Sequence, residues 1–182
     1  MKILIIDIET TGFLPTGKIV EVGLVELDLT TGGKRVLFDK VINPNLPKDE
    51  LDKAWIVTQG YMTSEEILNG ILFEDVKDEI QDIVNQYPEG VTAYNRNFDC
   101  DFLDIYGISF PKLLKCPMKA STNICKIPFK NGKGGNKWPN VEEAYNFFFP
   151  NNDYTELHRG ADDAYHEADI VLVLHRLGKF LD

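Results

Sequence analysis

Residues 2–12 decide the fold, and they read KILIIDIETTG. The stretch from Lys2 to Ile8 is apolar on both faces, which predicts a short central strand in a sheet that is covered on both sides. Because side chains alternate across a strand, Asp7 and Glu9 should project to the same side at its carboxyl end. Ligand sites in α/β sheets lie beyond the carboxyl ends of central strands. The segment therefore predicts two neighbouring carboxylates at the functional edge of a sheet.

The rest of the chain predicts an α/β fold in which helices flank a central mixed β-sheet. Residues 18–29 and 34–42 are rich in aliphatic and β-branched side chains and are separated by TTGG, so they predict a hairpin. A chain of 182 residues has the size of one domain, and we expect residues 1–182 to share one core. Apolar spacing and turn residues predict one more strand over residues 91–94, and helices near residues 76–87, 98–106, 139–148 and 160–179.

The composition argues against several classes of protein. Hydrophobic residues make up 43% and charged residues 26% of the chain, values typical of a folded globular domain and not of disordered, collagenous or coiled-coil chains. No run approaches the roughly 20 apolar residues of a membrane-spanning helix, so we expect a soluble cytoplasmic protein with no membrane partner. Cys100, Cys116 and Cys125 have no metal-ligand spacing, which favours free thiols in a reducing compartment.

The net charge of −10 opposes the capture of a polyanion through the long-range field. A nucleic-acid partner would therefore need a local reason to bind, and divalent cations at an acidic site would supply one. Asp7 and Glu9 repel each other unless they are protonated or bridged by a cation. The alternative is that water solvates both of them at the end of the strand.

Two later segments carry further candidate residues. Asp99 follows the strand over residues 91–94 at the start of a helix, where a simple helix cap is the alternative interpretation. His158 precedes the last helix and Asp163 lies inside its first turns, so the two side chains can flank one point in space. An imidazole takes a proton near neutral pH, and a carboxylate holds a hard cation. Carboxylates without paired cysteines or a His-x-x-x-His pair favour Mg²⁺ or Mn²⁺ over zinc.

Other polar stretches are interpreted as surface. Asp162 is expected to be exposed, because neighbours on a helix point apart. His166, Glu167 and Asp169 predict a solvated helix face. The glycine-rich, basic residues 130–137 predict a mobile surface loop, and contact with a phosphate backbone is the second interpretation.

Taken together, the candidate residues resemble a known family. The likeness covers nearly the whole chain, because residues 58–63, 73–76 and 138–145 also resemble segments that connect the motifs of that family. It implies an RNase H-like fold and a single exonuclease domain over residues 1–182. Three segments resemble, in order and spacing, the motifs of the DEDDh (DnaQ-like) 3′-to-5′ exonucleases: Asp7-Ile8-Glu9-Thr10-Thr11-Gly12, Asn95-x-Asn97-Phe98-Asp99 and His158-x-x-x-x-Asp163-Ala164.

The resemblance implies a role for each motif residue. Asp7, Glu9 and Asp163 would hold a first divalent cation, and Asp7 would also touch a second. Asp99 would complete the acidic cluster, partly through metal-bound water. His158 would be the general base that takes a proton from the attacking water. Two cations, Mg²⁺ or Mn²⁺, suit an in-line displacement at phosphorus.

The resemblance also implies contacts with substrate. Thr10, Thr11 and Gly12 would place backbone amides beside the terminal nucleotide, and Phe13 and Phe102 would pack against its sugar or base. For both phenylalanines a place in the ordinary core is the alternative.

The expected partner is the 3′ end of a single-stranded nucleic acid, which is shortened with release of nucleoside 5′-monophosphates. A polymerase partner and a homodimer stay open, as does the alternative of a non-catalytic nucleic-acid-binding or polymerase-associated scaffold with the same fold. The choice between DNA, RNA and short oligonucleotides depends on the approach of a few atoms to the 2′ position, which motif spacing does not report.

Overall fold

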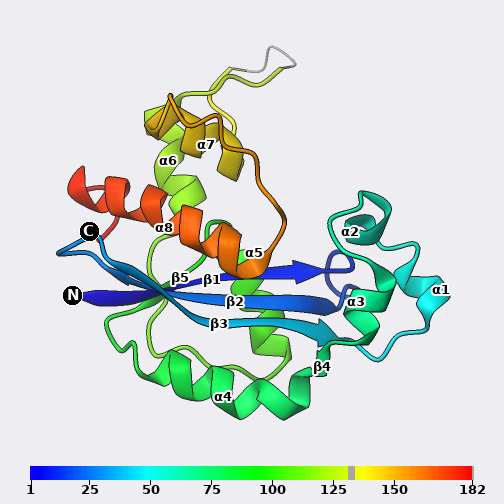
Figure 1. The fold of residues 1–182 in the computed structure, drawn as a ribbon. Helices are drawn as coiled ribbons and strands as arrows, with labels where there is room; N and C mark the ends of the chain where they lie inside the picture. Colours follow the sequence, from blue (N-terminus) through cyan, green and yellow to red (C-terminus); the bar gives the residue numbers. More distant parts are fainter. Residues whose placement is uncertain (131–133, 182) are drawn as a thin grey trace.

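A computed structural model describes residues 1–130 and 134–181 of the chain (Figure 1). Its centre is a five-stranded sheet in the order β4-β3-β2-β1-β5. β2 is antiparallel to β1 and β3, whereas β5 runs parallel to β1 and β4 runs parallel to β3. The mixed sheet and the hairpin predicted from the sequence are confirmed. The strands are β1 (Lys2–Thr10), β2 (Ile19–Asp28), β3 (Lys34–Asn43), β4 (Ile71–Leu72) and β5 (Val91–Thr92).

Helices cover both faces of this sheet. In Figure 1, α8 crosses one face, α4 lies against the other, and α1, α2 and α3 gather beyond the ends of β1 and β3. None of the helices in the described ranges is long and apolar enough to cross a membrane. The helices are α1 (Lys48–Leu51), α2 (Trp55–Thr58), α3 (Ser64–Leu68), α4 (Phe73–Asn85), α5 (Arg96–Ile105), α6 (Pro117–Cys125), α7 (Val141–Phe148) and α8 (Gly160–Arg176).

The alternation of side chains along β1 divides the core into two layers. Ile3 and Ile5 belong to the cluster formed with α7 and α8, whereas the residues at positions 4, 6 and 8 belong to the cluster formed with α4 and α5. The strand is therefore apolar on both faces, as predicted. Asp7 and Glu9 share the phase of Ile3 and Ile5, so they face the side of the sheet on which α8 lies.

The first turn of α8 touches the sheet through two glycines. A Cβ atom built on Gly23 of β2 would stand 2.1 Å from the carbonyl carbon of Gly160. No side chain fits in this space, so the backbones of β2 and α8 come into direct contact. This contact fixes where the first turns of α8, which carry Asp163, lie over the sheet.

Some element boundaries differ from those predicted. The helix expected over residues 139–148 begins at Val141, because Asn140 caps it in a reciprocal arrangement with Glu143. The strand expected over residues 91–94 is paired only at Val91 and Thr92. α6 was not predicted. Of the basic stretch 130–137, which was interpreted as a mobile loop, residues 131–133 lie outside the described residues.

Candidate active site

Asp7 and Glu9 lie at the carboxyl end of β1, where the sequence placed them. Asp7 is half-buried, and its Oδ2 atom is closed to solvent and has no hydrogen-bond partner among the described residues. Burial, followed by the charges of Glu167 and Glu9, raises the pKa of the Asp7 carboxyl well above its usual range. A sealed carboxylate oxygen among other acids is a place for a proton or a cation.

Asp99 enters the same cluster from the first turn of α5. It is buried, and its Oδ1 atom accepts a hydrogen bond of 3.2 Å from the backbone amide of Ile8. Asn95 occupies the cap position of this helix, so Asp99 is not the helix cap of the alternative interpretation. Burial raises the pKa of Asp99 well above its usual range, although the bond from Ile8 acts in the opposite direction.

Asp163 is fully buried in α8 and organises the segment that precedes the helix. Its Oδ1 atom accepts hydrogen bonds from the hydroxyl of Tyr154 (2.9 Å) and the amide of Leu157 (3.3 Å), and its Oδ2 atom accepts one from the amide of Arg159 (2.7 Å). Two of these donors are the backbone amides on either side of His158. Asp163 therefore holds the histidine segment in place, a role that the sequence did not indicate.

His158 reaches the acids from this segment. Its Nδ1 atom lies 3.7 Å from Oε1 of Glu9. Two aromatic rings contact the imidazole edge to face: Tyr61, with ring centroids 4.2 Å apart, and Trp55, with centroids 5.0 Å apart. The backbone of His158 has φ of 53°, in the left-handed region that most residues avoid. The surrounding contacts must hold the residue there.

Arg159 supplies a second anchor for the same segment. Its guanidinium donates to the buried carboxylate of Glu21 on β2, with Nη2 2.7 Å from Oε1, and the amide of Gly160 donates to Oε2 of the same residue. A buried carboxylate with paired donors is a strong, directional contact. Arg159 and Gly160 are thus fixed to the sheet immediately after His158.

Glu167 corrects one prediction. It was assigned to a solvated face of the last helix, but its side chain is 2% exposed and lines the same small pocket as Asp7 and Asp99. Its Oε2 atom accepts a hydrogen bond of 3.1 Å from the amide of Tyr94. Burial and the charge of Asp99 raise its pKa well above the usual range. The signal was present, because Glu167 lies four residues after Asp163 and so shares its helix face.

Glu156 is another acid that sequence reasoning missed. It lines the acidic pocket beside His158, and burial, followed by the charge of Asp163, raises its pKa to about 7. It lies in an irregular segment, where periodicity gives no signal. Asp162, expected to be exposed, is partly exposed and contacts His166, with Oδ2 3.2 Å from Nδ1.

The donor set of this pocket fits hard divalent cations. One ligand atom each of Glu9, His158 and Asp163 lies within 4.8 Å of the others, and the orphaned Oδ2 atom of Asp7 faces further acids. Carboxylate oxygens are preferred ligands of Mg²⁺ and Mn²⁺. A cation would offset the burial, and for Asp7 and Glu9 also the repulsion between acids, that raise the pKa values of these groups.

An apolar hollow of about 270 Å³ adjoins the acids. Phe13 is 79% exposed at its rim, and its ring meets Phe98 edge to face at a centroid distance of 5.9 Å. Trp55 also lines the hollow, so one face of the site is aromatic and the other acidic. The lining residues are Ile8, Glu9, Thr10, Gly12, Phe13, Trp55 and Phe98.

Two expected substrate contacts are not placed at this hollow. Phe102 is fully buried in the core beneath Phe98, so the core alternative applies to it. The amide of Thr11 donates to the carbonyl of Lys18 at 2.8 Å, which closes the loop after β1. This N–H group is therefore already used and is not free to donate to a nucleotide. Thr10 and Gly12 line the hollow, and the predicted contact of their amides with a nucleotide stays a prediction.

Comparison with known proteins gives the family. The chain matches the model of the RNase_T family, described as Exonuclease, over residues 4–171. No curated protein matches it.

Solved structures share the fold. Cell-death related nuclease 4 (CRN-4) has a TM-score of 0.69 and a sequence identity of 16%, and the match covers 99% of this chain and 66% of that one. The nuclease domain of 3′hExo, a DEDDh family member bound to rAMP, has a TM-score of 0.69 and 17% identity over 98% of this chain and 93% of that one. A 3′-exonuclease described for 3′-end specific recognition of histone mRNA stem-loop has a TM-score of 0.67 and a sequence identity of 18%. That match covers 98% of this chain and 83% of the other. The fold is that of the RNase H-like exonucleases.

Proposed function

Because this chain belongs to the RNase_T exonuclease family, as a DEDDh-type member of the RNase H-like superfamily, we propose that it is a metal-dependent 3′-to-5′ exonuclease. Its substrate is the 3′ end of a single-stranded nucleic acid, and its products are nucleoside 5′-monophosphates. Residues 1–182 act as one exonuclease domain. The observation that supports the proposal best is the convergence of acids from β1, α5 and α8 on one pocket that has an orphaned carboxylate oxygen.

The acids are proposed to hold two divalent cations. Asp7, Glu9 and Asp163 would hold the first, Asp7 would also touch the second, and Asp99 would complete the acidic cluster. When bound, such cations lower the pKa of an attacking water and stabilise the leaving oxygen of an in-line displacement. The protein supplies the rigidity, because Asp99 is tied to Ile8 and Asp163 is tied to three donors of its own segment.

His158 is proposed as the general base. Burial lowers its pKa, but the contact with Glu9 and the nearby carboxylates raise it more, so the net pKa lies above the usual value. Nδ1 faces Glu9, which leaves Nε2 as the atom that takes the proton of the attacking water. The aromatic contacts with Trp55 and Tyr61 orient the ring for this transfer.

The apolar hollow is proposed to receive the terminal nucleotide. Phe13 and Phe98 offer ring faces and edges to the base or sugar, which suits any of the four bases. Thr10 and Gly12 border the same space. An apolar wall beside a cation site positions the scissile phosphate without sequence-specific contacts.

Matched oligonucleotides that carry either a 5′ or a 3′ label test the polarity of cleavage. With Mg²⁺ or Mn²⁺, the 5′-labelled strand should give a ladder of products that shorten with time, whereas the 3′-labelled strand should release a labelled mononucleotide at once. EDTA and the Asp7→Asn variant should abolish both results. Release of the 5′ label as the first mononucleotide would reverse the proposed polarity.

A non-catalytic scaffold is distinguished in the same assay. A scaffold would bind both strands with the metal present and shorten neither of them. A parallel series of single-stranded DNA, single-stranded RNA and dinucleotides, compared by initial rate, assigns the substrate class.

A further inference from the structure

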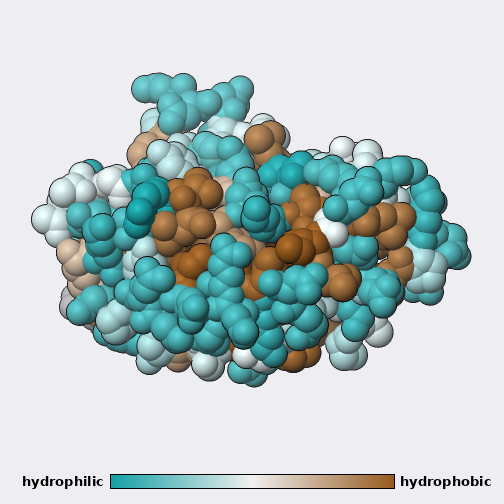
Figure 2. Space-filling view, turned by 60° about the horizontal axis from the view of Figure 1, so that its bottom comes forward, coloured by the Kyte–Doolittle hydropathy of each residue, from teal (hydrophilic) through white to brown (hydrophobic). Residues whose placement is uncertain are grey.

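A second pocket lies apart from the acidic site among the described residues. It has a volume of about 560 Å³, within the range of roughly 300–1,000 Å³ that is usual for small-molecule sites. It opens on the face of the sheet covered by α4, and it shares no lining residue with the acidic pocket or the apolar hollow. Figure 2 turns this face forward and shows apolar side chains exposed in hollows between hydrophilic ones.

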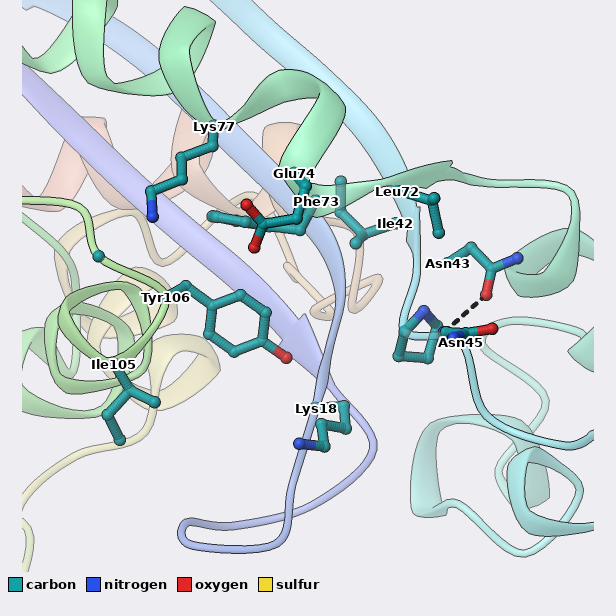
Figure 3. A pocket seen from close by; sticks show the side chains of 12 residues that line it. Lys18, Ile42, Asn43, Asn45, Leu72, Phe73, Glu74, Lys77, Ile105 and Tyr106 are labelled. Atoms are coloured by element: carbon teal, nitrogen blue, oxygen red, sulfur yellow. Dashed lines mark hydrogen bonds between the residues drawn. The ribbon is translucent and has the colours of Figure 1, made fainter.

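Two lysines give this pocket a positive charge. Lys18 enters it from the segment between β1 and β2, and Lys77 enters it from α4 (Figure 3). Neither ammonium group is among the ion pairs formed within the described part of the chain. The Nζ atom of Lys77 lies close over Gly107, where a Cβ atom would stand 2.5 Å from it. In a chain of net charge −10, two ammonium groups that line one pocket and form no ion pair there favour an anionic ligand.

An aromatic wall lies between the two lysines. The rings of Phe73 and Tyr106 meet edge to face with centroids 4.7 Å apart. The Tyr106 hydroxyl accepts a hydrogen bond of 3.3 Å from the amide of Ile19, so its own hydrogen stays available to a ligand. In Figure 3 this hydroxyl points into the space between Lys18 and Asn45. Burial raises the pKa of Tyr106, which keeps the hydroxyl a donor at neutral pH.

The remaining polar groups narrow the chemistry of the ligand. The side chain of Asn43 is occupied, since it donates to the carbonyl of Leu68 and accepts from the amide of Asn45. The carboxylate of Glu74 extends over the pocket beside Tyr106 (Figure 3). A carboxylate repels a phosphate but accepts hydrogen bonds from the hydroxyls of a sugar. The pocket thus offers cations, a carboxylate and an aromatic wall to one ligand.

We propose that this pocket is a second nucleotide-binding site, separate from the acidic centre. The phosphate pairs with Lys18 beside the Tyr106 hydroxyl, the sugar hydroxyls bond to Glu74, and the base packs against Tyr106 and its apolar surroundings, while Lys77 adds positive charge on the other side of the ring. The ligand is either a free nucleoside monophosphate or one nucleotide of a strand. This inference goes beyond the proposed function, because occupation of the pocket needs neither metal nor hydrolysis.

Titration calorimetry of the full chain in EDTA tests the site with adenosine 5′-monophosphate, adenosine and inorganic phosphate as probes. The monophosphate should bind at least about tenfold more tightly than either part alone. Lys18→Gln should weaken it by about tenfold, since it removes a charge-assisted contact, and Lys77→Gln should weaken it less, since it removes only a nearby charge. Lys112→Gln, which removes an equal charge outside the pocket, should leave the affinity unchanged. Circular dichroism spectra show whether each variant keeps the fold.

No binding of the monophosphate, equal affinity for phosphate alone, or unchanged affinity in both lysine variants would each overturn the proposal. The Phe13→Ala variant separates this site from the apolar hollow, because the part of the binding that Lys18→Gln removes should persist in Phe13→Ala. Complete loss of monophosphate binding in Phe13→Ala would place the ligand in the hollow and reject the second site. Since EDTA is present throughout, none of these outcomes depends on nuclease activity.

The source of the nucleotide is decided by competition. A single-stranded hexamer that displaces the monophosphate, and that itself loses affinity in Lys18→Gln and Lys77→Gln, assigns the pocket to a nucleotide within a strand. A hexamer that leaves the monophosphate bound assigns it to the free nucleotide. A hexamer that displaces the monophosphate equally well from a chain with both lysine substitutions would contradict the lysine contacts.

Discussion

The backbone amide of Ile8 donates a hydrogen bond to Oδ1 of Asp99, so strand β1 itself positions an acid that lies 91 residues away in the sequence. The same strand carries Asp7 and Glu9 on either side of Ile8. One strand therefore positions three carboxylates, and both faces of that strand are packed in the core. This arrangement separates the structural role of Asp99 from its proposed role as a ligand.

Asp99→Asn should remove activity and keep the fold. The amide oxygen still accepts from Ile8, whereas the lost charge should lower the hydrolysis rate by at least ~10²-fold. Asp99→Ala should also unfold more easily, by ~1–3 kcal/mol, because the buried amide of Ile8 loses its partner. Denaturant titration of both variants measures the difference. Equal stability of the two variants would show that the bond contributes nothing.

His158→Asn should isolate the contribution of the imidazole. Asparagine tolerates the left-handed backbone that residue 158 adopts, so the segment should keep its shape. The maximal rate should fall by about 10²–10⁴-fold, the usual contribution of a general base, with the metal affinity largely kept. The pH dependence of the rate provides the check. An acidic limb that stays the same in the variant as in the unmodified chain would remove His158 from the mechanism.

Trp55 lines the apolar hollow and also contacts the imidazole of His158, so its replacement should affect both KM and kcat. Trp55→Ala should raise KM and lower kcat, each by about 10-fold, because a loosened base loses its orientation. Trp55→Phe should restore part of kcat by keeping an aromatic edge. Steady-state kinetics on a single-stranded oligonucleotide separates the two constants. Trp138→Ala, which changes the other tryptophan of the chain, is the control and should keep both.

The metal-free protein should lose stability as the pH rises. Burial, then neighbouring charges, raise the pKa values of Asp7, Asp99 and Glu167, and that of Glu156 to about 7. A carboxyl group whose pKa is raised in the folded state contributes its full stabilisation of the fold below its unfolded-state pKa, near about 4. This contribution is lost as the pH rises through the folded-state pKa. Thermal unfolding in EDTA should therefore occur at lower temperature at pH 8 than at pH 5.

Mg²⁺ should restore much of the lost stability at pH 8. Glu167→Gln should flatten the pH dependence, since its amide oxygen still accepts from Tyr94 while one titrating group is removed. Glu89→Gln, on the surface, should leave the slope as it is. A metal-free protein that gains stability from pH 5 to pH 8 would contradict the raised pKa values.

Periodicity accounts for what the sequence could predict. The two-residue repeat of β1 placed Asp7 and Glu9 on one face, and the apolar segments on either side of TTGG predicted the hairpin. The four-residue spacing from Asp163 to Glu167 carried the same kind of information, but high polarity led to the interpretation of a solvated face. The desolvation cost of a buried acid is offset by hydrogen-bond partners that the sequence alone does not show, and for Glu167 one such partner is the amide of Tyr94.

Contacts made by irregular segments could not be predicted. Trp55 lies on a helix of four residues, too short for an apolar repeat, and meets His158 only because three short helices pack beyond the end of the sheet. Arg159 and Glu21 are 138 residues apart, and their pairing follows from the way α8 crosses β2. Such contacts depend on tertiary packing rather than on local pattern.

Gly23 and Gly160 leave no space for a side chain, so substitutions at these two positions should be poorly tolerated. A single added methyl group at position 23 would wedge the start of α8 away from β2, and the displacement would pass directly to Asp163 and the histidine segment that it anchors. Variants at these two positions should thus impair catalysis by misalignment even though neither glycine can touch substrate chemistry. Random mutagenesis should find them as intolerant as the acids themselves.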